Sequence, residues 1–214
     1  MPRVACVQTL DAHVYLLFTP SLCVGDPWAT LDAAIDGGVD AVQWRVKVRD
    51  ADGVARARAV CRSRGVAFVV DDDVALAIAV DADGAHVGQE DMPAATARAQ
   101  LRFGQVLGVS THDTAQIAAA QRDGADHVGF GPCFPTTTKG YTSGQSDDAI
   151  RAAVRAARVP LYAIGGIDAA NVARLLALGV RRIAVSSAIL RAHDPRAAAA
   201  ELRRQVSSIA SPNE

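Results

Sequence analysis

This sequence of 214 residues has no surplus of charge of either sign, no long apolar run and no paired-cysteine motif. Its 22 Lys and Arg balance 23 Asp and Glu, which gives a formal net charge of −1. Binding to a phosphate backbone or to an anionic membrane needs a surplus of Lys and Arg, so neither is favoured. No segment reaches the ~18 consecutive apolar residues of a membrane helix. We therefore expect no nucleic-acid partner and no membrane partner.

The first ten residues contain one Arg and no long apolar run, which is not the pattern of a signal peptide. The four cysteines are far apart, form no Cys-x-x-Cys pair and have no His at zinc-finger spacing: Cys6, Cys23, Cys61 and Cys133. We interpret them as small thiols in a reducing compartment, and expect a cytoplasmic protein. We expect Cys133 to fill space in the core.

Short apolar, β-branched runs alternate with Ala-rich amphipathic stretches along the whole chain. The runs are apolar at successive positions, which is typical of parallel strands covered by helices on both faces. Strand–helix alternation of this kind predicts right-handed crossovers. The candidate strands cover residues 15–18, 41–44, 67–70, 84–87, 106–109, 127–130, 161–164 and 182–185.

Candidate helices cover residues 26–36, 111–123, 168–178 and 194–206, with Asp at three of the four starts and Gly after three of the ends. Strand–helix units averaging about 25 residues predict a single (β/α)8 TIM barrel. The rival is a doubly wound open sheet, but the first strand is not followed by Gly-x-Gly-x-x-Gly. We expect one domain over 1–214, with an N-terminal extension at 1–13 and a frayed tail at 207–214.

Chemistry in such barrels collects where the strands end. After the second strand, alternation places Gln43, Arg45 and Lys47 on one side of the chain. A Gln and two cations on the inner face of a barrel are costly unless they meet an anion. The alternative is an exposed strand end with solvated charges.

Carboxylates follow the third and fourth strands. Asp71, Asp72 and Asp73 are consecutive, and Asp91 ends the run Gly-Gln-Glu-Asp. We interpret Asp73 as the cap of the next helix and Glu90 as solvated. Three adjacent carboxylates repel one another unless a cation or a proton relieves them. Carboxylates from neighbouring strand ends predict a shared Mg²⁺, which prefers hard oxygens and phosphate.

The remaining strand ends offer groups that bind anions. Ser110 either contacts a ligand or caps the following helix. Hydroxyls and one ammonium after the sixth strand, and glycines and hydroxyls after the seventh and eighth, suit phosphate oxygens: Thr136, Thr138, Lys139, Gly166, Ser186 and Ser187. The residues alone thus predict an enzyme that handles two phosphorylated small molecules or one diphosphate. We expect its mouth to keep the carboxylates on one side and the phosphate-binding cations apart from them.

The motifs, taken in order, resemble thiamine phosphate synthase, also called thiamine-phosphate pyrophosphorylase. The likeness covers about residues 14–206. It rests on Gln43-x-Arg45-x-Lys47, Asp71-Asp72, the runs GAHVGQED (84–91), GVSTH (108–112) and GFGPCFPTTTK (129–139), and IGGI (164–167).

The resemblance implies a (β/α)8 barrel that joins 4-amino-5-hydroxymethyl-2-methylpyrimidine diphosphate to thiazole phosphate with Mg²⁺ and releases diphosphate. Asp72 and Asp91 would hold the metal. Arg45, Ser110 and Lys139 would act in catalysis. The substrate-binding set would be Gln43, Arg45, Lys47, Asp71, Ser110, Thr136, Thr138, Lys139, Gly166, Ser186 and Ser187. The pattern is compatible with a homo-oligomer.

Two alternatives remain at this point. A related thiazole tautomerase shares the barrel, but its acid–base His lies in a Gly-His-x-Phe motif where this chain has Pro132. The other alternative is a barrel that binds phosphate ligands without catalysis. Its best support is Asp71, which stands where the family usually has Asn, because an extra negative charge there opposes diphosphate binding.

Overall fold

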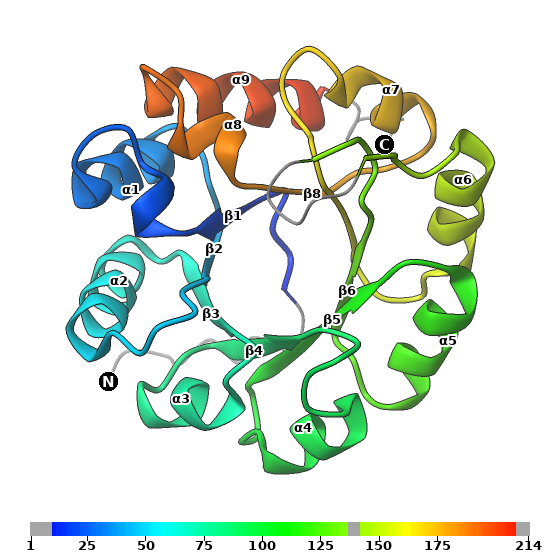
Figure 1. The fold of residues 1–214 in the computed structure, drawn as a ribbon, viewed down its shortest axis with the longest axis horizontal. Helices are drawn as coiled ribbons and strands as arrows, with labels where there is room; N and C mark the ends of the chain where they lie inside the picture. The colour runs from blue at the N-terminus through cyan, green and yellow to red at the C-terminus, as the bar shows by residue number, and fades with distance from the viewer. Residues whose placement is uncertain (1–9, 137–141, 209–214) are drawn as a thin grey trace, which may run out of the picture.

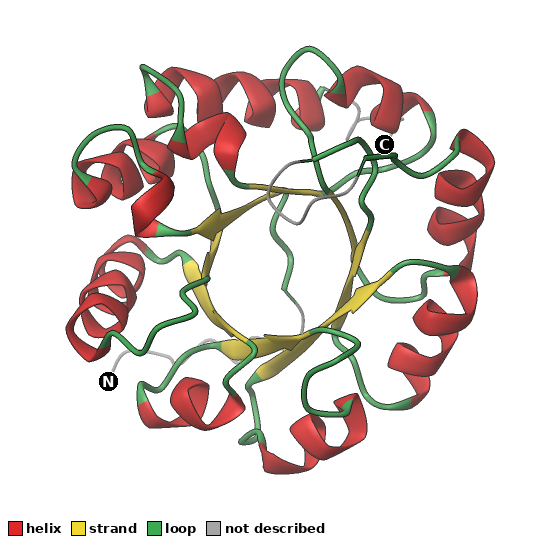
Figure 2. Cartoon of the chain, in the orientation of Figure 1, coloured by secondary structure: helices red, strands yellow, loops and turns green. Residues whose placement is uncertain are grey.

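The computed structural model describes residues 10–136 and 142–208, and in these ranges eight parallel strands close into a barrel inside a ring of helices (Figures 1 and 2). Each strand pairs with its neighbour in sequence, and β8 pairs with β1. The (β/α)8 TIM barrel is therefore confirmed, and the open sheet is excluded. The strands are β1 (Val14–Phe18), β2 (Ala41–Trp44), β3 (Ala67–Asp71), β4 (Gly84–Val87), β5 (Val106–Thr111), β6 (His127–Phe130), β7 (Leu161–Ile164) and β8 (Ile183–Val185).

The helices follow the strands around the outside of the ring (Figure 1). A 3₁₀ turn, η1 (Pro20–Leu22), precedes the first of them, and the short α8 lies between β8 and the final helix. The helices are α1 (Pro27–Asp36), α2 (Ala51–Arg64), α3 (Val74–Ala79), α4 (Ala94–Gln100), α5 (Thr114–Arg122), α6 (Asp147–Ala156), α7 (Val172–Ala177), α8 (Ser187–Leu190) and α9 (Pro195–Ser207).

Two of the predicted helix starts are confirmed. Asp26 accepts hydrogen bonds from the backbone at the start of α1, and Asp194 does the same for α9. Asp73 caps α3 as predicted, by accepting from Leu76 N at 2.8 Å. Helix α9 continues through Ser207, and residues 209–214 lie outside the described part of the chain.

The other two starts each lie three residues later than predicted: Thr114 in place of Thr111, and a cap at Asn171 in place of Asp168. Helix α5 begins at Thr114 behind its cap, Asp113, because Thr111 completes β5 and donates from its hydroxyl to Gly129 O at 2.9 Å. Ser110 is thus a strand residue and not a helix cap. Helix α7 begins at Val172, because Asp168 closes a turn before it.

The core has two layers, which explains why the strands are apolar on both faces. The larger layer lies between strands and helices and includes Leu31, Phe68 and Ile150. The smaller layer fills the inside of the barrel and includes Tyr15 and Tyr162. Side chains alternate between the two layers along each strand, so a strand buried in both cannot show a polar face.

Residues 10–13 close the amino-terminal end of the barrel. Leu10 and Ala12 are buried with the inner layer, and in Figure 1 the blue segment before β1 lies across the inside of the ring. The hydroxyl of Tyr162 donates to Leu10 O at 2.7 Å and accepts from Ala12 N at 3.1 Å. The carboxyl ends of the strands are left as the open mouth. No helix in the described ranges is long and apolar enough to span a membrane.

Candidate active site

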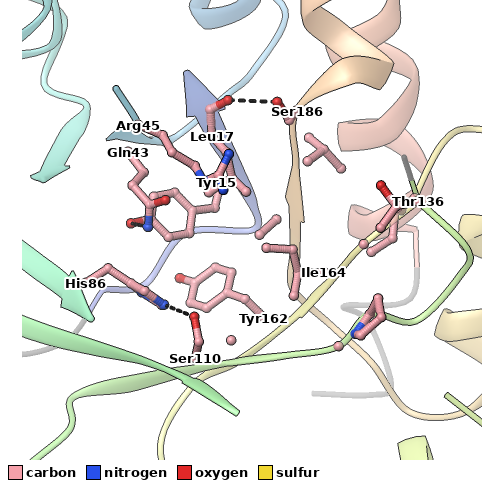
Figure 3. A pocket seen from close by; sticks show the side chains of 18 of the residues that line it. Tyr15, Leu17, Gln43, Arg45, His86, Ser110, Thr136, Tyr162, Ile164 and Ser186 are labelled. Atoms are coloured by element: carbon pink, nitrogen blue, oxygen red, sulfur yellow. Dashed lines mark hydrogen bonds between the residues drawn. The ribbon is translucent and has the colours of Figure 1, made fainter. Parts of the chain in front are cut away.

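A pocket opens at the carboxyl ends of the strands, with polar groups on opposite walls (Figure 3). Most of the predicted site residues line it: Gln43, Arg45, Asp71, Ser110, Thr136, Gly166, Ser186 and Ser187. Arg45 and Gln43 point into it from one side and Thr136 faces them from the other (Figure 3). Lys47, Asp72 and Asp91 lie beside the pocket on the loops after β2, β3 and β4. Thr138 and Lys139 lie outside the described residues, so their placement stays a prediction.

Gln43 on β2 and Arg45, the first residue after that strand, both have polar partners. Gln43 is buried and donates from Nε2 to the Tyr15 hydroxyl at 3.2 Å. Arg45 Nε lies 3.4 Å from Asp71 Oδ2, and the two side chains are only 16% and 12% exposed. Of the two cations predicted on the inner face, Arg45 therefore meets its anion on the neighbouring strand, whereas the Lys47 side chain is 74% exposed.

A second pair of opposite charges lies next to the first. Lys47 Nζ donates to Asp72 Oδ2 at 2.6 Å, and this bond raises the pKa of the Lys47 ammonium. Burial raises the pKa of Asp91 above its ordinary 3.8, and the neighbouring Asp72 carboxyl raises it further. The carboxyl groups of Asp72 and Asp91 thus face each other, with one ammonium beside them.

These pairs correct the expectation that the mouth keeps its charges apart. Lys47 contacts Asp72 and Arg45 lies against Asp71, so cations and carboxylates interleave on one wall. The physical reason is that each group needs a partner of opposite charge. Arg45 and Lys47 need anions, and the adjacent carboxylates of Asp71 and Asp72 need cations, so the four side chains pair with one another.

The backbone of the loops after β3 and β4 orients the carboxylates of Asp72 and Asp91. Asp72 has φ 62°, a left-handed conformation that Asp tolerates, and its N–H donates to His86 O at 2.8 Å. Gly88 N donates to Asp91 Oδ2 at 2.7 Å, and a Cβ on Gly88 would lie 2.7 Å from that oxygen. Gln89 donates from Nε2 to Ser110 O at 2.6 Å. The Gly-Gln-Glu-Asp turn therefore positions both a candidate metal ligand and the end of β5.

The opposite wall brings backbone and hydroxyls to the pocket. Gly166 has φ 64°, and a Cβ there would lie 2.5 Å from Pro135 O in the loop after β6. Only glycine allows these loops to approach so closely. Ser186 donates from its hydroxyl to Leu17 O at 3.1 Å (Figure 3), and Ser187 begins α8.

Two histidines on the pocket floor were not among the predicted site residues. His86 and His127 are both buried, and the ring of His86 contacts Ser110 (Figure 3). A signal was available, because each is a polar residue inside an otherwise apolar strand.

The described ranges contain no group of three or more His, Cys, Asp or Glu that could hold a metal ion, so Asp72 and Asp91 are a candidate pair of ligands and not a complete protein site. Two facing carboxylates suit Mg²⁺, which usually takes one or two from the protein and completes its shell with water and phosphate. Asp72 and Asp91 are the residues that could hold it. Cys133 has no such role: burial raises its thiol pKa to about 12, and Sγ donates to Phe130 O.

Comparison with known proteins identifies the family. The family model described as thiamine monophosphate synthase matches residues 14–189. A thiamine-phosphate synthase of Chloroflexus aurantiacus is 44% identical over 204 residues, covering 92% of this chain and 94% of that protein. One of Streptomyces avermitilis is 41% identical, covering 96% and 99%. A solved thiamine phosphate pyrophosphorylase of Pyrococcus furiosus superposes with TM-score 0.84 at 32% identity, covering 93% and 97%. The chain therefore belongs to the thiamine-phosphate synthase family, whose members are transferases of thiamine biosynthesis.

Proposed function

We propose that this chain condenses 4-amino-5-hydroxymethyl-2-methylpyrimidine diphosphate with thiazole phosphate and releases diphosphate. One observation carries this proposal: cationic or polar groups line opposite walls of one pocket, and a carboxylate pair lies beside one of these walls. Arg45 lines the first wall, with Lys47, Asp72 and Asp91 beside it, while Thr136 and Gly166 line the second. We assign the diphosphate to the first wall and the monophosphate to the second.

The residues of the first wall would hold the leaving group. Arg45 is a planar, permanently charged donor whose fork matches phosphate oxygens, and it already points into the pocket. Lys47 adds a point charge at the edge. A diphosphate that departs from the pyrimidine methylene carbon gains negative charge, and cations placed in advance stabilise that charge.

We propose Mg²⁺ as the bound metal, with Asp72 and Asp91 as its ligands. When bound there, it would neutralise charge on the diphosphate oxygens. This is supported by the raised pKa of Asp91, which comes first from burial and then from the neighbouring Asp72 carboxyl, because a divalent cation would relieve the repulsion between the two carboxylates. Lys47 supplies part of that relief by itself.

Positioning of the two substrates would supply the rest of the rate acceleration. The thiazole nitrogen attacks the methylene carbon from which diphosphate departs, so no protein nucleophile is required. The chain's residues need only hold the two reacting atoms close and exclude water. Thr136, Gly166, Ser186 and Ser187, with Thr138 and Lys139 from outside the described part, are the proposed contacts. The buried Cys133 thiol is consistent with this reaction, since its pKa of about 12 keeps it from acting as a nucleophile.

Incubating the purified protein with both substrates, with Mg²⁺ and then with EDTA, tests the proposal. We expect thiamine phosphate with Mg²⁺ and little with EDTA. Conversion between thiazole phosphate tautomers without any coupling would favour the tautomerase instead, although Pro132 offers no proton where that enzyme has its His. Binding of both substrates without reaction would favour a non-catalytic barrel, the alternative that the Arg45–Asp71 pair supports.

We further propose that the protein works in the cytoplasm. The three described cysteines, Cys23, Cys61 and Cys133, are free thiols, as expected in a reducing compartment. Assembly into a homo-oligomer stays a prediction, and size-exclusion chromatography with light scattering would measure it.

A further inference from the structure

Two buried imidazoles contact each other inside the barrel because the residue between them, on the intervening strand, is a glycine with no side chain. His86 on β4 and His127 on β6 are both register partners of Gly108 on β5. A Cβ on Gly108 would lie 2.2 Å from His86 Nδ1 and 2.3 Å from His127 Nε2. Without that atom, the two ring nitrogens lie 3.4 Å apart across the glycine.

The contact continues to the pocket on one side only. His86 Nε2 lies 3.0 Å from Ser110 Oγ (Figure 3). His127 Nδ1, at the other end, is buried and has no hydrogen-bond partner among the residues that the structure describes. The His127 ring is enclosed edge-on by Tyr15 and Tyr162, with ring centroids 6.0 Å and 5.6 Å away. The chain of contacts therefore runs from a closed end at His127 to an open end at Ser110.

The protonation of the His127 ring determines the direction of the hydrogen bonds along this chain of contacts. Burial, and then the neighbouring His86, hold the pKa of His127 well below its ordinary 6.5, so its ring is neutral and has one N–H. If His86 Nδ1 donated to His127 Nε2, the single N–H of the His127 ring would have to be on Nδ1, which faces no acceptor among the described residues. Orphaned buried N–H groups are rarer than under-used acceptors, which indicates that the proton is on Nε2 and points at His86.

We propose that His127 is a positioning residue that determines the direction in which the Ser110 hydroxyl donates its hydrogen bond. His127 Nε2–H donates to His86 Nδ1, His86 Nε2–H donates to Ser110 Oγ, and the Ser110 hydroxyl donates its own hydrogen into the pocket. Ser110 would then bind an atom that only accepts. In the proposed function, on which this inference rests for its ligand, a pyrimidine ring nitrogen or a phosphate oxygen is such an atom.

Nitrogen-15 NMR of the ring nitrogens tests the hydrogen-bond direction without any substrate. The chain has five histidines, so assignment by single substitutions is practical. We expect both His86 and His127 to have the proton on Nε2 in the unmodified protein. A proton on His86 Nδ1 that points at His127 would overturn the inference, whether or not the protein makes thiamine phosphate.

Variants test the consequence for binding. His127→Phe keeps a ring in the core and removes the donor, and His127→Gln offers an amide N–H near the place of Nε2. We expect His127→Phe to change the His86 tautomer signal and to raise KM for the pyrimidine diphosphate about five- to tenfold, the scale of one lost hydrogen bond. The KM for thiazole phosphate should stay the same, and His127→Gln should restore most of the loss.

Tyr162→Phe is the matched control. It removes the hydroxyl that bonds Leu10 and Ala12 at the far end of the barrel, so it should lower stability without shifting the KM ratio of the two substrates. A folded His127→Phe with an unchanged His86 tautomer and unchanged KM values would contradict the inference. If His127→Phe does not fold, the tautomer spectrum of the unmodified protein and the His127→Gln kinetics decide.

Discussion

Arg45 and Asp71 form an ion pair on the inner wall of the pocket, with Arg45 Nε 3.4 Å from Asp71 Oδ2. Both side chains are largely buried, so water screens the attraction little. A diphosphate that approaches Arg45 must compete with this carboxylate. The pair therefore holds the guanidinium in place and at the same time opposes the anion that it is proposed to bind.

Asp71→Asn should separate these two effects. The substitution keeps the shape of the side chain and removes its charge, so we expect turnover to hold or rise and KM for the pyrimidine diphosphate to fall, by about three- to tenfold for one screened charge. Steady-state kinetics with the second substrate saturating measures both. Asp73→Asn, which removes the same charge from a helix cap, should leave KM unchanged. A collapse of activity in Asp71→Asn alone would show that Asp71 has an active role, such as binding the metal.

The raised pKa of Asp91 predicts a pH-dependent requirement for Mg²⁺. As pH falls, Asp91 takes up a proton at a higher pH than an ordinary Asp does, and it then loses the charge that would bind the metal. The Mg²⁺ concentration for half-maximal activity should therefore increase on acidification, starting above pH 3.8. Measuring this concentration across mildly acidic pH tests the point. A constant value would contradict the assignment of Asp91.

Asp91→Asn extends the same reasoning to stability. The raised pKa means that the fold favours the neutral form, so Asp91 contributes stability at low pH that is lost as pH rises through its pKa. Without metal at neutral pH, the uncharged Asn should slightly raise Tm, while the rise in Tm that Mg²⁺ produces should vanish. Thermal unfolding with and without Mg²⁺ measures both, and an unchanged metal response would exclude Asp91 as a ligand.

Gly108→Ala should destabilise the barrel, because its Cβ would overlap two imidazole nitrogens at 2.2 and 2.3 Å. Overpacking of this kind usually costs about 1–3 kcal/mol. Chemical denaturation gives the change in free energy of unfolding. Gly25→Ala is the control, since a Cβ there meets nothing within 4 Å. Equal stability of the two variants would mean that the histidines do not meet across Gly108.

Cys133 should be inert toward thiol reagents in the folded protein. Burial raises its pKa to about 12, so almost no thiolate forms at neutral pH. Labelling with a thiol reagent followed by peptide mass spectrometry should find Cys133 modified only after denaturation. Rapid labelling in the native state would mean that the loop after β6 opens.

Much of the fold could be predicted from the sequence, because parallel strands buried on both faces leave continuous apolar runs and capped helices leave Asp and Gly at their ends. The start of α5 could not. Thr111 pairs with Phe130 in the β5–β6 register, and that tertiary pairing draws the residue into the strand. Local capping chemistry near Thr111 could not reveal a partner on another strand.

Part of the lining of the pocket could be predicted from the sequence, but the contacts among its residues could not. The sequence indicated that Arg45 and Lys47 needed anions and that the Asp cluster needed cations. Only the barrel shows that these groups satisfy one another. The contact between His86 and His127 escaped prediction because it depends on the register of three strands and on the missing side chain of Gly108.

The stoichiometry of the reaction tests the central claim most directly. Phosphorus-31 NMR of the purified protein with pyrimidine diphosphate, thiazole phosphate and Mg²⁺ follows both products at once. We predict one diphosphate released for each thiamine phosphate formed, at a rate that Arg45→Ala lowers strongly. Diphosphate release without coupling, or no reaction by a folded protein that binds both substrates, would contradict the proposed synthase.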